Sequence, residues 1–322
     1  MQKQMPKPKL SATRHARIRA LAKLNLDLRV LGKRADGYHE LRTIFQTISL
    51  ADAIDLSFTP ARHTTISLDD PLAIPDNLAA RAAQLAMDSM RSTGRVEIRL
   101  TKRIPMGAGL GGGSSDAAAI LLALPVLAGR VIELAQLIEM AQQLGSDVPF
   151  FLLGGRAAAI GRGTELFPLP DSPTRYGVLI DPGIHVSTAE AYRLLGAGLT
   201  SGLQQNKIGS FQSQMWGQGC PGACANDFEA VVFKLHPRLG AIKRKLIRSG
   251  ASPAMMTGSG SALFGLFKER AQAAHAAEWF EGPDTPYGFS LVNRVRYQSL
   301  WRRALDKHIV GRTWPPRSRY AR

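Results

Sequence analysis

The segment PMGAGLGGGSSDAAA, residues 105–119, combines the residue types that bind phosphate. Five of the seven residues from 107 to 113 are glycine, and two serines and an alanine run follow them. Glycine leaves backbone N–H groups accessible, and next to the positive end of a helix dipole such groups form an anion site. The missing side chains also let a bulky phosphate group approach the backbone. We interpret the segment as a phosphate-binding loop rather than as a purely structural turn.

A strand and a helix are expected to hold this loop. RVEIRL, residues 95–100, alternates as a strand does and leads into the loop, and SSDAAAILLAL is typical of a helix. Ser114, Ser115 and Asp116 stand where the N-cap of that helix is expected. A flexible linker would have no reason to join a strand to a strong helix, so the position supports a built site.

Two common phosphate motifs do not fit the loop. Gly107, Gly109 and Gly112 satisfy the spacing G-x-G-x-x-G, but the dinucleotide fingerprint also needs an acidic residue about 20 positions on, at the end of a second strand. Glu133 stands there and opens a predicted helix instead. The Walker A pattern needs lysine after its last glycine, and this chain has Gly113 at that place.

The remaining periodicity predicts an α+β chain in two halves. LNLDLRV, residues 24–30, alternates strictly and predicts a half-buried strand with Asn25 on its polar face. A helix is expected to begin near Asp76, a good N-cap residue. We expect strands in FFLL and AAAIG, and the last strand in GFSLVNRVRY. PLPDSPT is typical of a linker and predicts a boundary near residues 168–175.

The net charge of +16 belongs to the two ends of the chain. Residues 1–19 hold six basic residues and no acidic one, and residues 302–322 hold seven basic residues and one aspartate. Each end therefore carries +6, which leaves +4 of the total for the body. Residues 1–17 and 301–322 are predicted to be disordered basic tails. The body lacks interleaved basic and aromatic residues, so nucleic-acid binding is disfavoured.

The composition also bears on location. No apolar run approaches the roughly 18 residues that a membrane span needs. The basic N-terminus is not followed by the apolar region of a secretory signal, and the two cysteines lie close together in the segment CPGAC. We expect a cytoplasmic protein with no membrane partner. The sequence carries no signal for an oligomeric state.

The loop resembles the ATP loop of the GHMP kinase superfamily, P-x-G-x-G-L-G-S/G-S-S. TGSGSALFGLF, residues 257–267, resembles that superfamily's C-terminal glycine turn. The block ALAKLNLDLRVLGKRADGYHELRTIFQTISLAD closely resembles one branch, the 4-diphosphocytidyl-2-C-methyl-D-erythritol kinases of the non-mevalonate isoprenoid pathway. LGSDVPFFLLGG and NDFE match that branch too, and the resemblance spans roughly residues 18–300.

The resemblance implies a two-domain GHMP kinase architecture, with an S5-like N-terminal domain at 18–168 and a ferredoxin-like C-terminal domain at 175–300. It implies ATP-dependent phosphorylation of the 2-hydroxyl of 4-diphosphocytidyl-2-C-methyl-D-erythritol, with ATP and Mg²⁺. The alternatives are a sister kinase of homoserine or mevalonate and, with much less support, a nucleic-acid-binding protein that uses its tails.

The resemblance also implies the roles of individual residues around ATP. Lys23 and Asp147 would form a pair at the acceptor hydroxyl. Ser114 and Ser115 could hold phosphate or Mg²⁺, cap the helix, or do both. The full set implied around ATP comprises Asn77, Leu78, Lys102, Pro105, Gly107, Gly109, Gly111, Gly112, Gly113, Ser114 and Ser115, where Asn77 has the alternative of being only an N-cap.

The acceptor site is implied by DGYHEL and by the C-terminal turn. Tyr38 would supply a stacking face for cytosine and His39 a hydrogen bond to the base edge, with Tyr192 as a second ring on the opposite side. The alternatives are a hairpin turn flanked by Tyr and His, and a core position for Tyr192. The full set of implied substrate-binding residues is Asn25, Tyr38, His39, Tyr192, Gly258, Ser259 and Gly260.

Overall fold

The computed structural model describes residues 12–196 and 224–309. Residues 1–11 and 310–322, which make up most of the two predicted tails, lie outside the described residues. The inner ends of these tails are folded, because residues 14–17 open the first strand and residues 301–305 close the last long helix. Ala16 and Trp301 are buried there, so the predicted tails reached too far into the chain.

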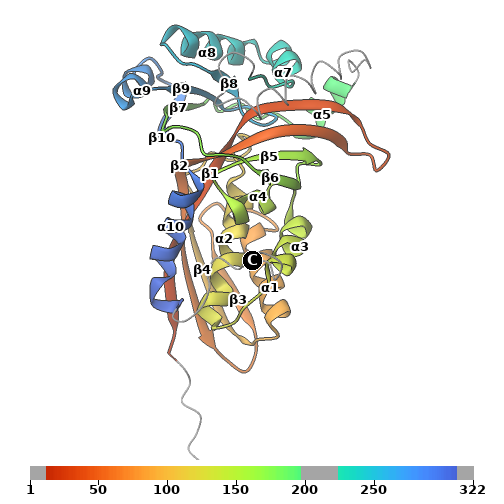
Figure 1. Cartoon of the computed structure of the whole chain (residues 1–322), viewed down its shortest axis with the longest axis vertical. Coiled ribbons are helices and arrows are strands. Elements are labelled where there is room, and N and C mark those ends of the chain that lie inside the picture. The colour runs from red at the N-terminus through yellow and green to blue at the C-terminus, as the bar shows by residue number, and fades with distance from the viewer. Residues whose placement is uncertain (1–11, 197–223, 310–322) are drawn as a thin grey trace, which may run out of the picture.

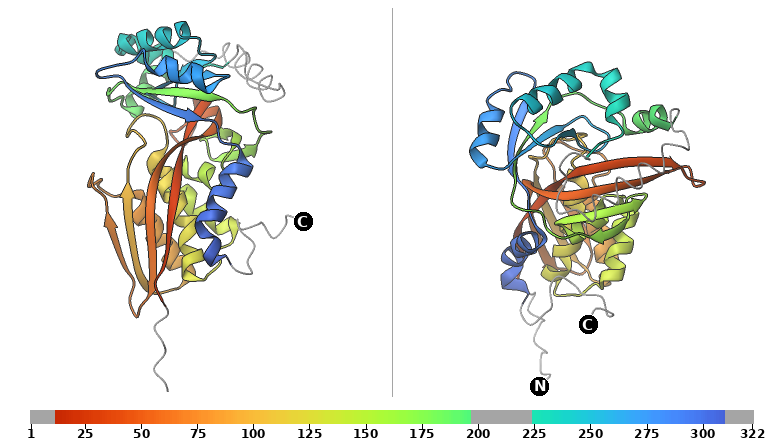
Figure 2. Two further views of the ribbon diagram at one scale, coloured as in Figure 1. Left: turned by 90° about the vertical axis from the view of Figure 1, so that its left-hand side faces the viewer. Right: turned by 45° about the horizontal axis from the view of Figure 1, so that its top comes forward.

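The N-terminal half is a six-stranded sheet with helices on one side (Figures 1 and 2). The strand order is β3-β4-β2-β5-β6, and β1 pairs antiparallel with β2. Its elements are β1 (Arg14–Lys33), β2 (His39–Pro60), β3 (Thr65–Asp69), α1 (Leu78–Met90), β4 (Gly94–Thr101), α2 (Gly112–Ala128), α3 (Leu134–Leu144), α4 (Val148–Leu153), β5 (Arg156–Gly161) and β6 (Glu165–Pro168).

The C-terminal half is an antiparallel sheet of four strands in the order β10-β7-β9-β8. The predicted boundary at 168–175 lies between β6 and β7. The elements of this half, with the last helix of the chain, are β7 (Tyr176–Asp181), α5 (Thr188–Gly196), α7 (Glu229–Leu235), α8 (Pro237–Arg248), β8 (Ala254–Met256), β9 (Leu263–Phe267), α9 (Arg270–Ala277), β10 (Thr285–Ser290), α10 (Arg294–Leu305) and the 3₁₀ turn η1 (Asp306–His308).

Long strands join the two halves. In Figure 1, β1 and β2 run along the lower body and curve outward beneath α5. One face of the C-terminal sheet packs on helices α5 and α7–α9, and the other face packs on β1 and β2. Leu24 and Ile48 contribute to this second contact from β1 and β2, and Phe264 from β9. The strands β1 and β2 therefore form the contact between the two halves.

This packing corrects the predicted half-buried strand at residues 24–30. Asn25 is 3% exposed and Asp27 is fully buried, so both faces of β1 are covered in this region. Alternation indicated which residues share a face, but not that a second domain would cover the polar face. Buried polar groups need partners, and Asp27 accepts hydrogen bonds from the side chain of Arg29 and from the backbone N–H of Ala225.

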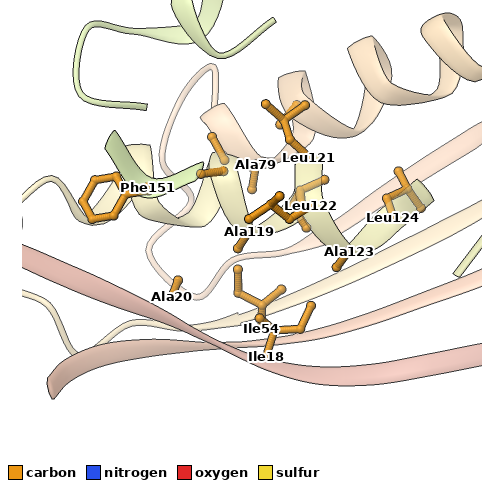
Figure 3. Close-up of a cluster of buried hydrophobic side chains, with 14 of the residues drawn as sticks. Ile18, Ala20, Ile54, Ala79, Ala119, Leu121, Leu122, Ala123, Leu124 and Phe151 are labelled. Atoms are coloured by element: carbon orange, nitrogen blue, oxygen red, sulfur yellow. The ribbon is translucent and has the colours of Figure 1, made fainter. Parts of the chain in front are cut away.

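Helix α2, which follows the glycine loop, is the centre of the N-terminal core. Its residues from Ser115 to Leu127 are all buried, against β1, β2 and the helices α1, α3 and α4. Figure 3 shows Leu121, Leu122 and Leu124 of α2 among side chains of the sheet and of α1. A helix that is apolar on all sides must be surrounded by other elements. The loop at its start is consequently fixed to the rigid centre of the domain.

Several predicted elements differ in the structure. FFLL belongs to helix α4, not to a strand, because a short apolar run has no diagnostic period and Pro149 favours the first turn of a helix. GFSLVNRVRY ends its strand at Ser290, and Asn293 then caps α10 by accepting from the N–H of Arg296. Helix α10 packs on the N-terminal core, so the last helix belongs there rather than with the predicted domain at 175–300.

In the two described ranges, 12–196 and 224–309, no helix has both the length and the apolar character required to cross a lipid bilayer.

Candidate active site

The glycine loop ends directly on the dipole of helix α2. The helix begins at Gly112 with Gly111 as its N-cap, so Ser114, Ser115 and Asp116 lie inside the helix and the predicted cap there was wrong. Gly111 can take this role because its φ of +68° is a left-handed conformation that residues with a Cβ rarely adopt. The first N–H groups of a helix have no partner within it. The first N–H groups of α2 are therefore directed into the space that the glycine loop encloses.

A cavity of about 440 Å³ lies between the loop and the start of α1. We call it the nucleotide cavity. Ser115 is not among its lining residues, because its buried hydroxyl donates to the carbonyl oxygen of Leu21 at 2.7 Å. The other ten residues of the predicted ATP set line the cavity together, namely Asn77, Leu78, Lys102, Pro105, Gly107, Gly109, Gly111, Gly112, Gly113 and Ser114.

Asn77 is both a helix cap and a lining residue of the nucleotide cavity. Its Oδ1 accepts from the N–H of Ala79 at 2.9 Å, and its Nδ2 donates to Asp70 at 2.9 Å. The predicted cap, Asp76, lies one residue too early and instead contacts Arg81 at the surface. The sequence offered two adjacent capping residues, and only the backbone path decided between them.

A buried cluster of charges underlies the nucleotide cavity. Lys102 Nζ lies 2.5 Å from Asp52 Oδ2 and 2.6 Å from Asp116 Oδ2. Asp52 Oδ1 also accepts from the N–H groups of Arg103 and Ile104. The cluster fixes the segment that leads into the loop. The sequence analysis did not predict these contacts, because Asp52 lies 50 residues from Lys102 and Asp116, named only as a helix cap, lies 14 residues from it.

Burial raises the pKa of Asp116 to about 7; Lys102 opposes this shift and Asp52 adds to it. Asp116 Oδ1 is buried and has no hydrogen-bond partner among the described residues. Burial acts to lower the pKa of Lys102, but the attraction of Asp116 and Asp52 outweighs it and leaves that pKa above its usual value. A single ammonium group thus compensates the charges of two carboxylates incompletely. Asp116 consequently retains its proton to a higher pH than an exposed aspartate does.

We expect the free energy of unfolding of Asp116→Asn, relative to that of the wild type, to increase as the pH rises from about 4 to about 7. Folding raises the pKa of this carboxyl, so its contribution to stability is complete below the unfolded pKa and is lost as the pH rises through the folded pKa of about 7. The amide does not ionise and lacks this loss, which is at most about 1.4 kcal/mol per pH unit. Urea unfolding at several pH values measures the difference, and a difference independent of pH would contradict the prediction.

Lys23 and Asp147 meet at the end of the loop. Lys23 Nζ lies 3.2 Å from Asp147 Oδ2 and donates to Asn25 Oδ1 at 2.7 Å. Asn25 Nδ2 donates to Thr43 Oγ1 at 2.7 Å, which directs Oδ1 toward the lysine. The lysine side chain is 4% exposed and the aspartate side chain 31% exposed. The ammonium is thus held by the fold, while the carboxylate faces open space.

The pair lines a cavity of about 260 Å³ that we call the reaction cavity. Gly109 and Gly111 of the loop line it as well as the nucleotide cavity, so the two spaces adjoin. Gly258 and Ser259 complete the wall, whereas Gly260 is not among the lining residues and faces Met256 and Val186. Two of the three predicted residues of the C-terminal turn are therefore at the site.

The loop and the C-terminal turn approach each other very closely. A Cβ built on Gly109 would lie 2.3 Å from the carbonyl oxygen of Thr257 and 3.2 Å from Gly258 Cα. Gly109 also has a φ of +77°. No side chain fits at this position, so the glycine is required by both space and backbone conformation.

A cavity of about 1280 Å³ opens on the other side of the reaction cavity. We call it the acceptor cavity. Tyr38, His39 and Tyr192, the three ring residues predicted for the acceptor site, all line this cavity, but their arrangement differs from the one expected. His39 stacks directly on Tyr192, with ring centroids 4.7 Å apart and an interplanar angle of 26°, so Tyr192 is not a second ring across a gap. Arg162 lies 3.5 Å over the ring of Tyr38, which is 53% exposed.

Arg162 is a site residue that the sequence analysis missed. It lines both the acceptor and the reaction cavity. It stands between Gly161 and Gly163 in the turn after β5, and a lone arginine between glycines was the only signal available.

Burial and the nearby Lys33 lower the pKa of His39, so its ring is neutral near pH 7.

Three adjoining cavities thus lie at the glycine loop, at the pair of Lys23 and Asp147 and at the aromatic residues. Two family models place the chain in the class of GHMP kinases. GHMP kinases N terminal domain matches residues 77–155, and GHMP kinases C terminal matches residues 207–280. The predicted two-domain α+β architecture of GHMP kinases is thereby confirmed.

Curated relatives identify the family. The chain is 65% identical over 97% of its length to the 4-diphosphocytidyl-2-C-methyl-D-erythritol kinase of Solibacter usitatus, of which it covers 99%. It is 40% identical over 80% of its length to the enzyme of the same name from Syntrophotalea carbinolica, of which it covers 92%. The chain therefore belongs to the family of 4-diphosphocytidyl-2-C-methyl-D-erythritol kinases and is an ATP-dependent phosphotransferase.

Solved structures agree with this assignment. A 4-(cytidine 5'-diphospho)-2C-methyl-D-erythritol kinase matches with a TM-score of 0.72 and 37% identity, over 85% of this chain and 98% of the other. A homoserine kinase from Cytophaga hutchinsonii matches with a TM-score of 0.69 but only 17% identity, over 91% of this chain and 98% of the other. The second match shows a shared fold alone. The sister kinases and the nucleic-acid-binding protein, the alternatives raised by the sequence, are not favoured.

Proposed function

We propose that this protein transfers the γ-phosphoryl group of ATP to the 2-hydroxyl of 4-diphosphocytidyl-2-C-methyl-D-erythritol. The observation that supports this most is the place of Lys23 and Asp147, which lie in the reaction cavity between the nucleotide cavity and the acceptor cavity. An acceptor that extends from the aromatic residues to this pair would present a hydroxyl where the phosphates approach. Membership of the family supports the substrate.

Asp147 accepts the proton of the attacking hydroxyl in this proposal. Phosphoryl transfer depends on positioning and on charge stabilisation more than on covalent chemistry by the protein. The carboxylate is open to the reaction cavity, and the buried ammonium group of Lys23 lies 3.2 Å from it. The lysine also supplies positive charge beside the oxygen that develops charge during transfer.

The glycine loop stabilises the phosphates. Its N–H groups and the dipole of α2 favour negative charge at the start of the helix. Gly109 and Gly111 line both the nucleotide and the reaction cavity, which places the loop along the boundary where the transferred group would pass. The rigid core around α2 keeps these groups in place before ATP binds, so little reorganisation is required.

Magnesium fits this site as an ion that the ATP phosphates hold for the most part. Protein carboxylates commonly supply only one or two of its ligands. Within residues 12–196 and 224–309 there is no group of three or more His, Cys, Asp or Glu that could hold a metal ion. Ser114, in the first turn of α2 and lining the nucleotide cavity, is the side chain that we place next to the ion. Bound Mg²⁺ would neutralise charge on the phosphates.

Cationic and aromatic residues of the acceptor cavity suit a cytidine diphosphate group. Lys33, Arg162 and Arg193 line this cavity, and guanidinium groups bind phosphate oxygens in pairs. The exposed ring of Tyr38 offers a stacking face for a base, and the neutral ring of His39 can hydrogen-bond a base edge. Homoserine and mevalonate have neither a base nor a diphosphate to meet these groups.

Replacing Tyr38 by Ala should raise the KM for the cytidylyl acceptor by about 5–150-fold, which corresponds to a stacking contribution of about 1–3 kcal/mol. The KM for ATP should change little, because Tyr38 lines the acceptor cavity and not the nucleotide cavity. Tyr38→Phe retains the ring and is the matched control. Steady-state kinetics with each substrate varied in turn measures both constants. A parallel rise of both would make Tyr38 a structural residue.

The proposed function is tested by ATP consumption with 4-diphosphocytidyl-2-C-methyl-D-erythritol, homoserine and mevalonate as acceptors. We expect turnover with the cytidylyl compound only, and ³¹P and ¹³C NMR of the product should place the new phosphate on the 2-hydroxyl. Turnover with another acceptor, or a phosphate elsewhere on the product, would contradict the proposal.

A cytoplasmic location stays a prediction from the composition and from the metabolic role of the family.

A further inference from the structure

The segment Asn226–Glu229, NDFE, matched the kinase branch in the sequence, but neither the predicted site nor the proposed mechanism uses it. It follows the gap in the described residues and leads into helix α7. Backbone hydrogen bonds tie it to β1, from Leu28 N–H to the carbonyl of Ala225 and from Asp227 N–H to the carbonyl of Leu28. Asp227 Oδ2 also accepts from the N–H of Val30 at 3.0 Å. The segment is thus fixed on the long strand that joins both halves.

Asn226 reaches from this anchor to the C-terminal turn. Its Nδ2 donates to the carbonyl oxygens of Met256 at 2.8 Å and of Gly258 at 2.7 Å, and its Oδ1 accepts from the N–H of Phe228 at 3.0 Å. Asn226 is 4% exposed. Both amide hydrogens and the amide oxygen are therefore in use, and a carboxylate of the same shape would place a negative oxygen against two carbonyls.

The turn that Asn226 holds is the one packed against the glycine loop. Thr257 O is the atom that leaves no room for a Cβ on Gly109, and Thr257 Oγ1 accepts from the N–H of Asn25 at 3.1 Å. Gly258 lines the reaction cavity. A shift of the turn would consequently alter the space between the loop and the pair of Lys23 and Asp147.

The other end of the segment reaches the acceptor cavity. The ring of Phe228 contacts the ring of Tyr192 edge to face, with centroids 4.7 Å apart, and Tyr192 stacks on His39. Phe228 itself lines the reaction cavity. Asn226 and Phe228 together connect the wall of the phosphate site to the aromatic residues that we assign to the acceptor.

We propose that Asn226 is a positioning residue for phosphoryl transfer, which holds the turn at Gly258 against the glycine loop so that the reaction cavity has its productive shape. This inference rests on the proposed function for the reaction that it serves. The asparagine acts through the backbone of the turn. Its loss should lower the rate of transfer without removing the nucleotide or acceptor contacts.

Asn226→Asp tests the inference because it keeps the size of the side chain and removes both donors. We expect kcat to fall by about 10²-fold, the loss that a displacement of about 1 Å can cause, while the KM for the acceptor changes little. Hydrogen–deuterium exchange should show faster exchange in the peptide that covers residues 254–263, and unchanged exchange in β4 and α2. Asn226→Ala removes both donors without adding charge, and the same measurements on it test the inference if Asn226→Asp does not fold.

Lys234→Met is the matched control. Lys234 is an exposed residue of α7, into which the same segment leads, and it lines none of the three cavities. It should retain wild-type kcat and the wild-type exchange pattern of the turn. A wild-type kcat in the Asn226 variants, or a loss of kcat without faster exchange in the turn, would overturn the inference. The wild-type protein is assayed beside the variants. If the wild type itself is inactive on the cytidylyl acceptor, the proposed function is contradicted, whereas the role of Asn226 is judged from the variants relative to an active wild type.

Discussion

Asp147→Asn should lower turnover by about 10²–10⁴-fold, the usual value of proton-transfer catalysis, and leave the affinity for ATP nearly unchanged. The substitution keeps the size of the side chain and removes the group that accepts the proton. Asp147 is 31% exposed and faces the reaction cavity, so the fold should tolerate the change. Single-turnover measurements, with ATP affinity measured separately, test the prediction. Turnover within a few-fold of wild type would exclude Asp147 from proton transfer.

The partner of Asp147 provides a second test of the same site. Lys23→Ala should also reduce turnover strongly, and the losses of the two single variants should not add in the double variant, because both groups act as one unit. Lys23 is buried and lies 5.0 Å from the centroid of the Phe45 ring, so Lys23→Met is the better-packed companion. Thermal unfolding of each variant shows whether a loss of turnover reflects a loss of fold. Additive losses would mean that the residues act separately.

Gly109→Ala should weaken ATP binding by about 5–150-fold, because a methyl group added where there is no room costs roughly 1–3 kcal/mol and displaces the loop. The new methyl group would meet the carbonyl oxygen of Thr257 at 2.3 Å in addition to taking a φ of +77°. The loop or the C-terminal turn would have to move, and both enclose the reaction cavity. Titration with a non-hydrolysable ATP analogue measures the affinity.

Gly282→Ala is the matched control for the glycine experiment. Gly282 has a φ of +66°, and nothing lies within 4 Å of a Cβ built on it. It shares the backbone strain of Gly109 but is not a lining residue of the nucleotide, reaction or acceptor cavity. Equal effects of the two substitutions on ATP affinity would show that the loss is general destabilisation and would refute the role of the close contact at Gly109.

Short-range patterns were reliable where the chemistry is local. The glycines of the loop lie close together in the sequence and the helix that follows them is continuous, so a glycine loop leading into a helix could be predicted. Ten of the eleven predicted ATP residues line one cavity. Local rules failed where the local pattern allowed two outcomes. FFLL could form a strand or a helix, and either Asp76 or Asn77 could cap α1.

The amino-acid sequence by itself determined the family, the glycine loop before α2 and the proximity of Lys23 and Asp147, because motifs in family order specify these without knowledge of packing. Tertiary structure alone decided which polar groups meet across long separations. It placed Asp52 and Asp116 on Lys102, and it turned the hydroxyl of Ser115 away from the nucleotide cavity. The physical reason is that a polar residue in a periodic pattern shows which face of a strand is polar, but not whether another part of the protein will pack on that face. When the C-terminal sheet covered β1, the polar groups there had to find hydrogen-bond partners within the protein. Some of these partners came from distant segments, such as Thr43 for Asn25 and Ala225 for Asp27.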